Sequence, residues 1–127
     1  MFDDVCRMIK TFRDLDVYKE AYELMLIVHG EVKKFPVFEK YDLAPQCRRC
    51  SKSPPSNIAE GWAKRMFEKE FKKHLNVAIG SCNEMEVHTE TARDLRYWDR
   101  AFCEMLLTRY QRLGGKLTNL RNNWKTF

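Results

Sequence analysis

The sequence predicts an all-α protein that folds as an antiparallel, up-down-up-down four-helix bundle. Apolar residues recur at intervals of three and four along four consecutive segments, which is the spacing of one helix face. The 127 residues include only five Gly and four Pro, which are too few for the many turns of an all-β fold. Short connections between helices make neighbours antiparallel. We therefore expect residues 1–11 to form an N-terminal extension and residues 12–127 to form one bundle domain.

The first helix is expected to begin near Asp16. Asp14 or Asp16 can cap its start, because a short side-chain acceptor satisfies a free backbone N–H there. Phe35-Pro36 is expected to end it, since a residue before proline is pushed out of the helical conformation. Its inward face comprises Val17, Ala21, Leu24, Val28, Val32 and Phe35.

The second helix runs from about Phe38 to Arg65 and contains Pro54-Pro55. Each proline lacks an N–H and clashes with the preceding turn, so a kinked helix and two short helices are both open interpretations. Asn57 followed by Glu60 resembles a capping box, which would restart the helix. Its inward positions are Leu43, Cys47, Cys50, Ile58 and Trp62.

The third helix has the most regular pattern, a seven-residue apolar repeat of the kind that packs in left-handed bundles. Gly80 lies inside this helix and costs about 1 kcal/mol relative to Ala. We expect that glycine to mark the close approach of a neighbouring helix. The repeat consists of Phe71, Leu75, Ala78, Cys82, Met85, Thr89 and Ala92.

The fourth helix is expected from about Tyr97 towards Trp124. Gly114-Gly115 weakens it, but the apolar pattern keeps its phase across the pair, so we expect the helix to continue. Its inward residues are Phe102, Leu106, Leu113, Leu117, Leu120 and Trp124.

Composition excludes several classes of protein. Hydrophobic residues make up 44% and charged residues 32% of the chain, which is typical of a globular protein. No apolar run approaches the roughly 18 residues of a membrane span, and the opening MFDDVCRMIK does not resemble a signal peptide. Five cysteines without a secretion signal indicate free thiols in a reducing cytosol. We therefore expect a cytoplasmic location and no membrane partner.

The pair Cys47 and Cys50 forms a CxxC motif without a second pair, whereas structural zinc sites need four ligands. A redox CxxC normally follows a strand, and none is predicted here. We interpret the two cysteines as small apolar residues one helical turn apart.

No catalytic constellation or metal site is predicted. Di-iron bundles use Glu-x-x-His pairs, in which the two residues share a helix face. The nearest candidates, Glu70 with His74 and Glu84 with His88, have the wider i, i+4 spacing, and no other helix supplies carboxylates in register. Glycine-rich phosphate loops are absent. The expectation is a protein that is not an enzyme and uses no metal or other cofactor.

Basic residues are concentrated in two stretches of the chain, whose net charge is +5. Residues 43–83 hold 8 basic and 3 acidic side chains, and residues 105–127 hold 5 basic and no acidic ones. Basic regions favour nucleic acid, although they are also typical of the water-facing sides of amphipathic helices. Arg109, Arg112 and Lys116 share one helical stripe, which can follow a phosphate backbone. The candidate nucleic-acid-binding residues are Arg48, Arg49, Lys52, Lys64, Arg65, Lys69, Lys72, Lys73, Arg109, Arg112, Lys116, Arg121 and Lys125.

Four stretches give the sequence a family resemblance. They are FRDLDVYKEAYEL (Phe12 to Leu24), FPVFEKYDLAPQCRR (Phe35 to Arg49), SPPSNIAEG (Ser53 to Gly61) and KEFKKHLNVAIGSCNE (Lys69 to Glu84). The chain resembles the bacterial four helix bundle protein family, also called the 23S rRNA intervening sequence protein or S23 family, over roughly Phe12 to Leu120. That family places a single Pro after an apolar residue before the NIAEG element. Here Pro54 takes that place, so Pro54-Pro55 stand in tandem.

The resemblance implies a four-helix bundle and a homo-oligomer, which is a pentameric ring in known members. The family is also similar to the accessory proteins of diversity-generating retroelements, basic pentamers that bind nucleic acid and a reverse transcriptase. No catalytic residues come with it. We interpret Pro55, Asn57, Glu60, Gly61 and Gly80 as architectural, with Asn57 and Glu60 serving the backbone at the kink and the two glycines allowing close helix approach.

Two functions follow as hypotheses. The first is a non-enzymatic oligomeric scaffold that binds nucleic acid, RNA in particular, through basic helix faces. The alternative is a protein-interaction adaptor, for example an accessory subunit of a reverse transcriptase. Its candidate contact aromatics are Trp62, Phe67, Trp98 and Trp124.

Overall fold

The computed structural model describes residues 9–125 and contains, within them, four long helices and no strand. This confirms the predicted all-α class. Two short 3-10 helices precede the first and second long helices. The elements are η1 (Phe12–Asp14), α2 (Asp16–Val32), η2 (Val37–Glu39), α3 (Leu43–Ala63), α4 (Glu68–Asp94) and α5 (Arg100–Asn123).

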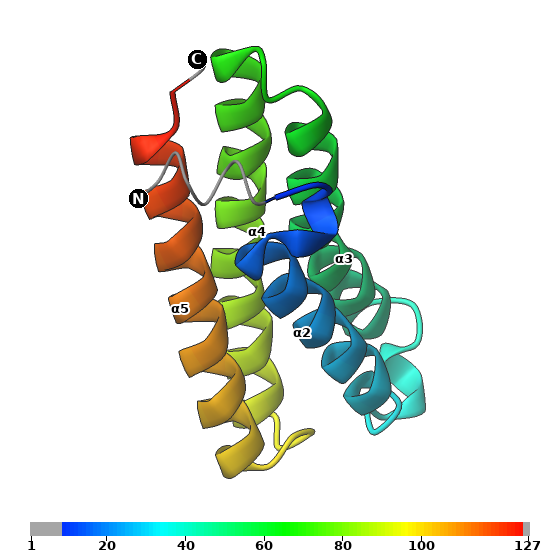
Figure 1. Ribbon diagram of the computed structural model, residues 1–127. Coiled ribbons are helices and arrows are strands. Elements are labelled where there is room, and N and C mark those ends of the chain that lie inside the picture. Colours follow the sequence, from blue (N-terminus) through cyan, green and yellow to red (C-terminus); the bar gives the residue numbers. More distant parts are fainter. Residues whose placement is uncertain (1–8, 126–127) are drawn as a thin grey trace.

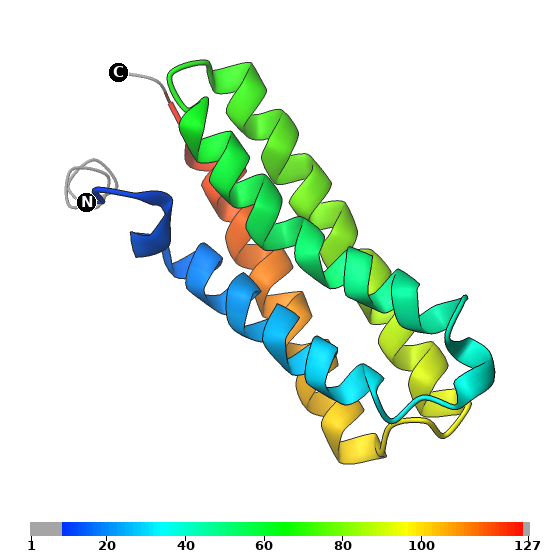
Figure 2. The same cartoon turned by 90° about the vertical axis from the view of Figure 1, so that its right-hand side faces the viewer.

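Consecutive helices run in opposite directions, as the colours of Figure 1 show. Helix α4 packs along both α3 and α5, and α2 packs mainly along α3 with a smaller contact to α5 (Figures 1 and 2). The arrangement is the predicted up-down-up-down bundle. No helix in residues 9–125 is long and apolar enough to cross a membrane. The expected N-terminal extension falls mostly on residues 1–8, which lie outside the described part, as does Cys6.

Helix α2 buries the face that its sequence predicts, from Val17 to Val32. The predicted cap is wrong, because the N-cap residue is Leu15 and it makes no side-chain cap hydrogen bond. The Asp14 carboxylate instead accepts hydrogen bonds from the backbone of Lys10 and Thr11, in a capping box that starts η1. Helix α2 ends at Val32, shortly before Phe35-Pro36.

Helix α3 continues through both prolines, so it is not broken into two. Pro54 and Pro55 are buried, and their packing helps to offset the two backbone hydrogen bonds that proline cannot make. Asn57 lies inside the helix, so the predicted capping box is wrong. Its side-chain amide donates to the Ser53 carbonyl one turn back, at 3.0 Å.

The heptad repeat of α4 is confirmed, since all seven predicted positions are buried. The expectation for Gly80 is wrong, because a Cβ there would meet nothing within 4 Å. The expectation of close helix approach is confirmed at Gly61, because a Cβ there would lie 2.9 Å from His74 Cβ and 3.1 Å from Phe71 Cδ1. Gly61 is thus the glycine that lets α3 and α4 approach closely.

Helix α5 continues through Gly114-Gly115, as predicted. The sequence analysis missed Cys103 and Tyr110, which are buried on this helix, and Trp98, which is buried before it. Trp62, Trp98 and Trp124 are all core residues, which confirms the inward positions predicted for Trp62 and Trp124 and contradicts the use of the three as contact aromatics, whereas Phe67 is exposed. Large aromatic rings gain most from burial, and this outweighs their use at a surface.

Candidate functional site

The contact between α3 and α4 carries a continuous line of polar side chains. We call this line the α3–α4 seam. It occupies one face of each helix, because its members recur at intervals of three, four or seven residues. The seam comprises Cys50, Ser53, Asn57 and Lys64 from the α3 side and His74, Ser81, Glu84 and His88 from α4.

The middle of the seam is held by serine and asparagine. The Ser81 hydroxyl donates to the Ser53 hydroxyl oxygen at 2.7 Å across the two helices. The Asn57 amide donates to the same oxygen at 3.1 Å. Residues of the NIAEG and AIGS elements are thereby joined, which supports an architectural role for Asn57.

One end of the seam is built around His74. Its Nδ1 lies 3.0 Å from the Asn57 amide oxygen and its Nε2 lies 3.2 Å from the Lys64 ammonium. Since ammonium can only donate, Nε2 accepts and Nδ1 carries the ring proton. Glu60, predicted to serve the backbone, is an exposed side chain with its carboxylate 4.0 Å from Nδ1 of this ring.

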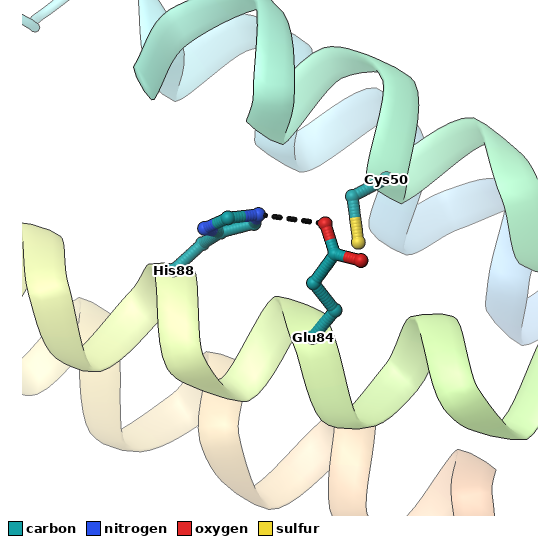
Figure 3. A group of neighbouring side chains, drawn as sticks. All are labelled: Cys50, Glu84 and His88. Atoms are coloured by element: carbon teal, nitrogen blue, oxygen red, sulfur yellow. Dashed lines mark hydrogen bonds and ion pairs between the residues drawn. The ribbon is translucent and has the colours of Figure 1, made fainter. Parts of the chain in front are cut away.

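The other end of the seam brings a thiol, a carboxylate and an imidazole together, as Figure 3 shows. His88 Nε2 lies 3.0 Å from a Glu84 carboxylate oxygen, and the Cys50 thiol donates to the Ser81 carbonyl at 3.3 Å. The three potential ligand atoms all lie within 4.8 Å of one another. Burial is the main cause that raises the pKa of the Cys50 thiol, and the neighbouring Glu84 carboxylate raises it further. Sequence reasoning missed this group because its thiol comes from a different helix.

Cys47, Cys50, Cys82 and Cys103 are free and buried. Burial raises the pKa of Cys47 and of Cys82 to about 12. Reactive thiols have lowered pKa values, so Cys47 behaves as the small apolar residue that the sequence analysis expected. Cys50 differs from it in facing Glu84.

The basic stripe predicted on α5 is largely occupied by acidic partners. The Arg109 guanidinium binds both carboxylate oxygens of Glu20, at 2.9 and 3.0 Å, and one of Glu23 at 3.1 Å. Lys116 pairs with Asp16 at 2.7 Å. These contacts join α5 to α2, and their carboxylates raise the pKa of Arg109 further. Arg112, the remaining residue of the stripe, is exposed and has no ion pair with any residue in 9–125.

Three other candidates lie along the first half of α3. Arg49 and Lys52 are exposed, and Arg48 is half-buried beside a shallow depression lined by α2 residues such as His29 and Gly30. They are separated along the bundle from the remaining candidates, because those belong to the turn after α3, the first turns of α4 and the end of α5.

The remaining seven candidates gather at one end of the bundle, where α3 turns into α4 and α5 finishes (Figure 1). The Arg121 guanidinium donates to Asn76 of α4 at 2.8 Å, and the Trp124 indole donates to the Arg65 carbonyl at 3.3 Å. The Arg65 guanidinium lies over the Trp62 ring, 4.5 Å from its centroid. Lys72 pairs with Glu68 at 2.8 Å. We call this group the basic end: Lys64, Arg65, Lys69, Lys72, Lys73, Arg121 and Lys125.

A comparison with known families gives one match. The family model described as 23S rRNA-intervening sequence protein matches residues 13–119. This agrees with the extent of the resemblance found in the sequence. A search of curated proteins found no match to the chain.

Proposed function

The chain belongs to the 23S rRNA-intervening sequence protein family, and from this premise we propose that it is a non-enzymatic, oligomeric scaffold that binds RNA. The family's description supports an RNA-related role. We place the binding surface at the basic end. Binding there is mainly electrostatic and only weakly dependent on sequence, because phosphate contacts carry little sequence information.

The observation that carries this proposal is the convergence of cations from three segments on the basic end. Lys69, Lys73 and Lys125 are exposed there, with no ion pair to any residue in 9–125. By contrast, Arg109 and Lys116 already face carboxylates, so nucleic acid would have to displace those partners. The basic end is therefore favoured over the α5 stripe.

The proposal includes a homo-oligomer, with the pentameric ring of the resemblance as the expected form. Exposed apolar side chains on the outer faces of two helices support it, Tyr22 and Leu26 on α2 and Val77 and Val87 on α4. A ring would repeat the basic end around its axis, and several modest contacts would then add through avidity.

The free thiols of Cys47, Cys50, Cys82 and Cys103 support a cytoplasmic location.

The test compares two variants that remove the same charge. One carries Lys69→Gln, Lys73→Gln and Lys125→Gln at the basic end, and its control carries Arg49→Gln, Lys52→Gln and Arg112→Gln. Binding of labelled single-stranded RNA is measured over a salt series, with the oligomer mass determined on the same samples. We expect only the first variant to bind more weakly, with a salt slope lower by roughly 0.7 for each lost phosphate contact. Equal losses in both variants, or no binding by the parent at low salt, would contradict the proposal.

A second candidate function is the protein-interaction adaptor, with a reverse transcriptase as its possible partner. The observation in its favour is an exposed apolar group around η2, where Val37, Phe38 and Tyr41 are 86%, 75% and 87% exposed. Such a patch is typical of protein-binding surfaces. Replacing all three by Ser would weaken capture of that partner and leave RNA binding unchanged.

A further inference from the structure

We propose that Cys50, Glu84 and His88 form a zinc-binding site at one end of the α3–α4 seam. The site takes a sulfur ligand from α3 and an oxygen and a nitrogen ligand from α4 (Figure 3). The i, i+4 spacing of Glu84 and His88 places both on one helix face. Cys50 lies opposite them because α3 and α4 pack along their length.

The geometry needs only small side-chain movements to hold the ion. Around a tetrahedral zinc ion with bonds of about 2.0–2.3 Å, ligand atoms lie roughly 3.3–3.8 Å apart. The three donor atoms here lie within 4.8 Å of one another, and His88 Nε2 and Glu84 Oε2 are 3.0 Å apart. Binding would require the Glu84 and Cys50 side chains to rotate towards one ion position, and the Cys50 thiol would give up its hydrogen bond to the Ser81 carbonyl.

The ligand set selects the class of ion. A thiolate and an imidazole suit zinc and similar transition metals, whereas magnesium and calcium require oxygen ligands. Three protein ligands leave one of the four zinc positions to water. Binding replaces the thiol proton, so Cys–SH and Zn²⁺ give the zinc thiolate and one proton released to solvent.

The site is open to the ion from solvent. The side chain of Glu84 is 58% exposed, whereas that of His88 is only 10% exposed. Glu84 is thus the exposed ligand, and Cys50 and His88 are the buried ones. A cation from solvent would first meet the Glu84 carboxylate, and the two buried side chains would then complete its binding.

The opposite end of the seam lacks these properties. His74 is engaged by Asn57 on one nitrogen and by the Lys64 ammonium on the other. A metal ion there would meet the Lys64 ammonium, and although the Glu60 carboxylate lies 4.0 Å from His74 Nδ1, no thiol belongs to this end of the seam. The two histidines therefore provide an internal control on the same helix.

The experiment titrates the reduced full-length protein with Co²⁺, a spectroscopic substitute for Zn²⁺, and then displaces it with Zn²⁺. We expect one Co²⁺ per chain, a near-ultraviolet thiolate-to-cobalt absorption band, and no displacement by Mg²⁺. Cys50→Ser should abolish the band, and Glu84→Gln should weaken binding by about 100-fold or more, since even the outer partners of metal ligands contribute 10–100-fold. Glu84 is exposed, so its variant tests the site even if Cys50→Ser folds poorly.

Three matched variants complete the design. Cys103→Ser, Cys82→Ser and His74→Ala should each retain the band, because none of these residues is one of the three proposed ligands. Absence of the band in the parent would overturn the proposal. The same holds for a band that survives Cys50→Ser or disappears in Cys103→Ser.

Discussion

The two ends of the α3–α4 seam start from the same pattern and differ in chemistry. Glu70–His74 and Glu84–His88 are both i, i+4 pairs on α4. His74 faces Asn57 and Lys64, whereas His88 faces Glu84 with Cys50 beside it. The comparison teaches that the facing helix, rather than the spacing on one helix, decides what a histidine can do.

The core behind the seam follows the same division. Behind His74 lies an aromatic cluster in which Trp62, Phe71 and Trp124 make edge-to-face contacts, with centroids 4.7 to 6.2 Å apart. Near Cys50 the core instead contains the sulfur atoms of Cys47 and Cys82, and both contribute to raising the Cys50 pKa. We expect the aromatic cluster near His74 to have a structural role. We expect the region of buried thiols near Cys50 to respond to metal ions and to pH.

The largest expected effect is stabilisation by zinc at the His88 end. A ligand present at 100 times its dissociation constant stabilises the folded state by about 2.7 kcal/mol. Thermal unfolding with and without ZnCl₂ measures this directly. The gain should vanish in Glu84→Gln and persist in His74→Ala, and an equal gain in both variants would remove the proposed distinction between the two ends.

The next effect concerns close packing at the His74 end. Gly61→Ala places a Cβ 2.9 Å from His74 Cβ and 3.1 Å from Phe71, and such overpacking costs about 1–3 kcal/mol. Gly80→Ala is the matched control, because its Cβ meets nothing within 4 Å. The control should stabilise by about 0.5–1 kcal/mol, since alanine is the better helix residue. Chemical denaturation of both variants tests the difference in sign.

The buried Cys82 thiol predicts that the free energy of unfolding depends on pH. The pKa of Cys82 is raised from 9.0 to about 12 by burial, so the thiol ionises more readily in the unfolded chain. Its contribution is fully present below pH 9 and is lost as the pH rises towards 12. At pH 10 the loss is on the order of 1 kcal/mol.

Unfolding free energies at pH 8 and pH 10 check this expectation. Cys82→Ala should lose less stability between the two pH values than the parent does. Met85→Ala, which also creates a cavity on the buried face of α4, should retain the parent's pH dependence. Identical pH dependences in parent and Cys82→Ala would show that this thiol does not titrate as expected.

The smallest effect is expected at the middle of the seam. Asn57→Ala removes hydrogen bonds to Ser53 and His74, which together contribute about 1 kcal/mol net. RNA affinity should not change, because the role is architectural. Unchanged melting combined with lost RNA binding would instead identify Asn57 as a ligand-binding residue.

The fold was largely predictable because helix periodicity records burial directly. All seven heptad positions of α4 are buried, and the apolar phase across Gly114-Gly115 indicated one continuous helix. Capping was not predictable, because Asp14 and Asn57 have acceptors that suit a cap but use them elsewhere: the Asp14 carboxylate accepts from the Lys10 backbone, and the Asn57 amide oxygen accepts from the His74 ring. A short polar side chain has several local partners, and only tertiary structure selects among them.

The candidate sites were less predictable because they depend on residues far apart in the chain. Arg109 and Lys116 share a stripe in the sequence, yet the carboxylates of α2 that pair with them cannot be seen from α5 alone. Likewise, Glu84 and His88 were evaluated without Cys50, since its helix position relative to α4 was unknown. Periodicity assigns a residue to a face but does not identify what packs against that face.

The ion pairs between α5 and α2 make the contact between these two helices sensitive to ionic strength. Helix α2 packs mainly along α3 and buries apolar residues such as Leu24 and Val28, and ion pairs with Arg109 and Lys116 also join it to α5. Salt screens such charges, with a Debye length of about 8 Å at 0.15 M and 3 Å at 1 M. Local opening of α2 should therefore become more frequent as salt rises, and amide hydrogen exchange would report it. The salt that would release RNA from the site proposed at the basic end would thus also loosen the contact between α2 and α5.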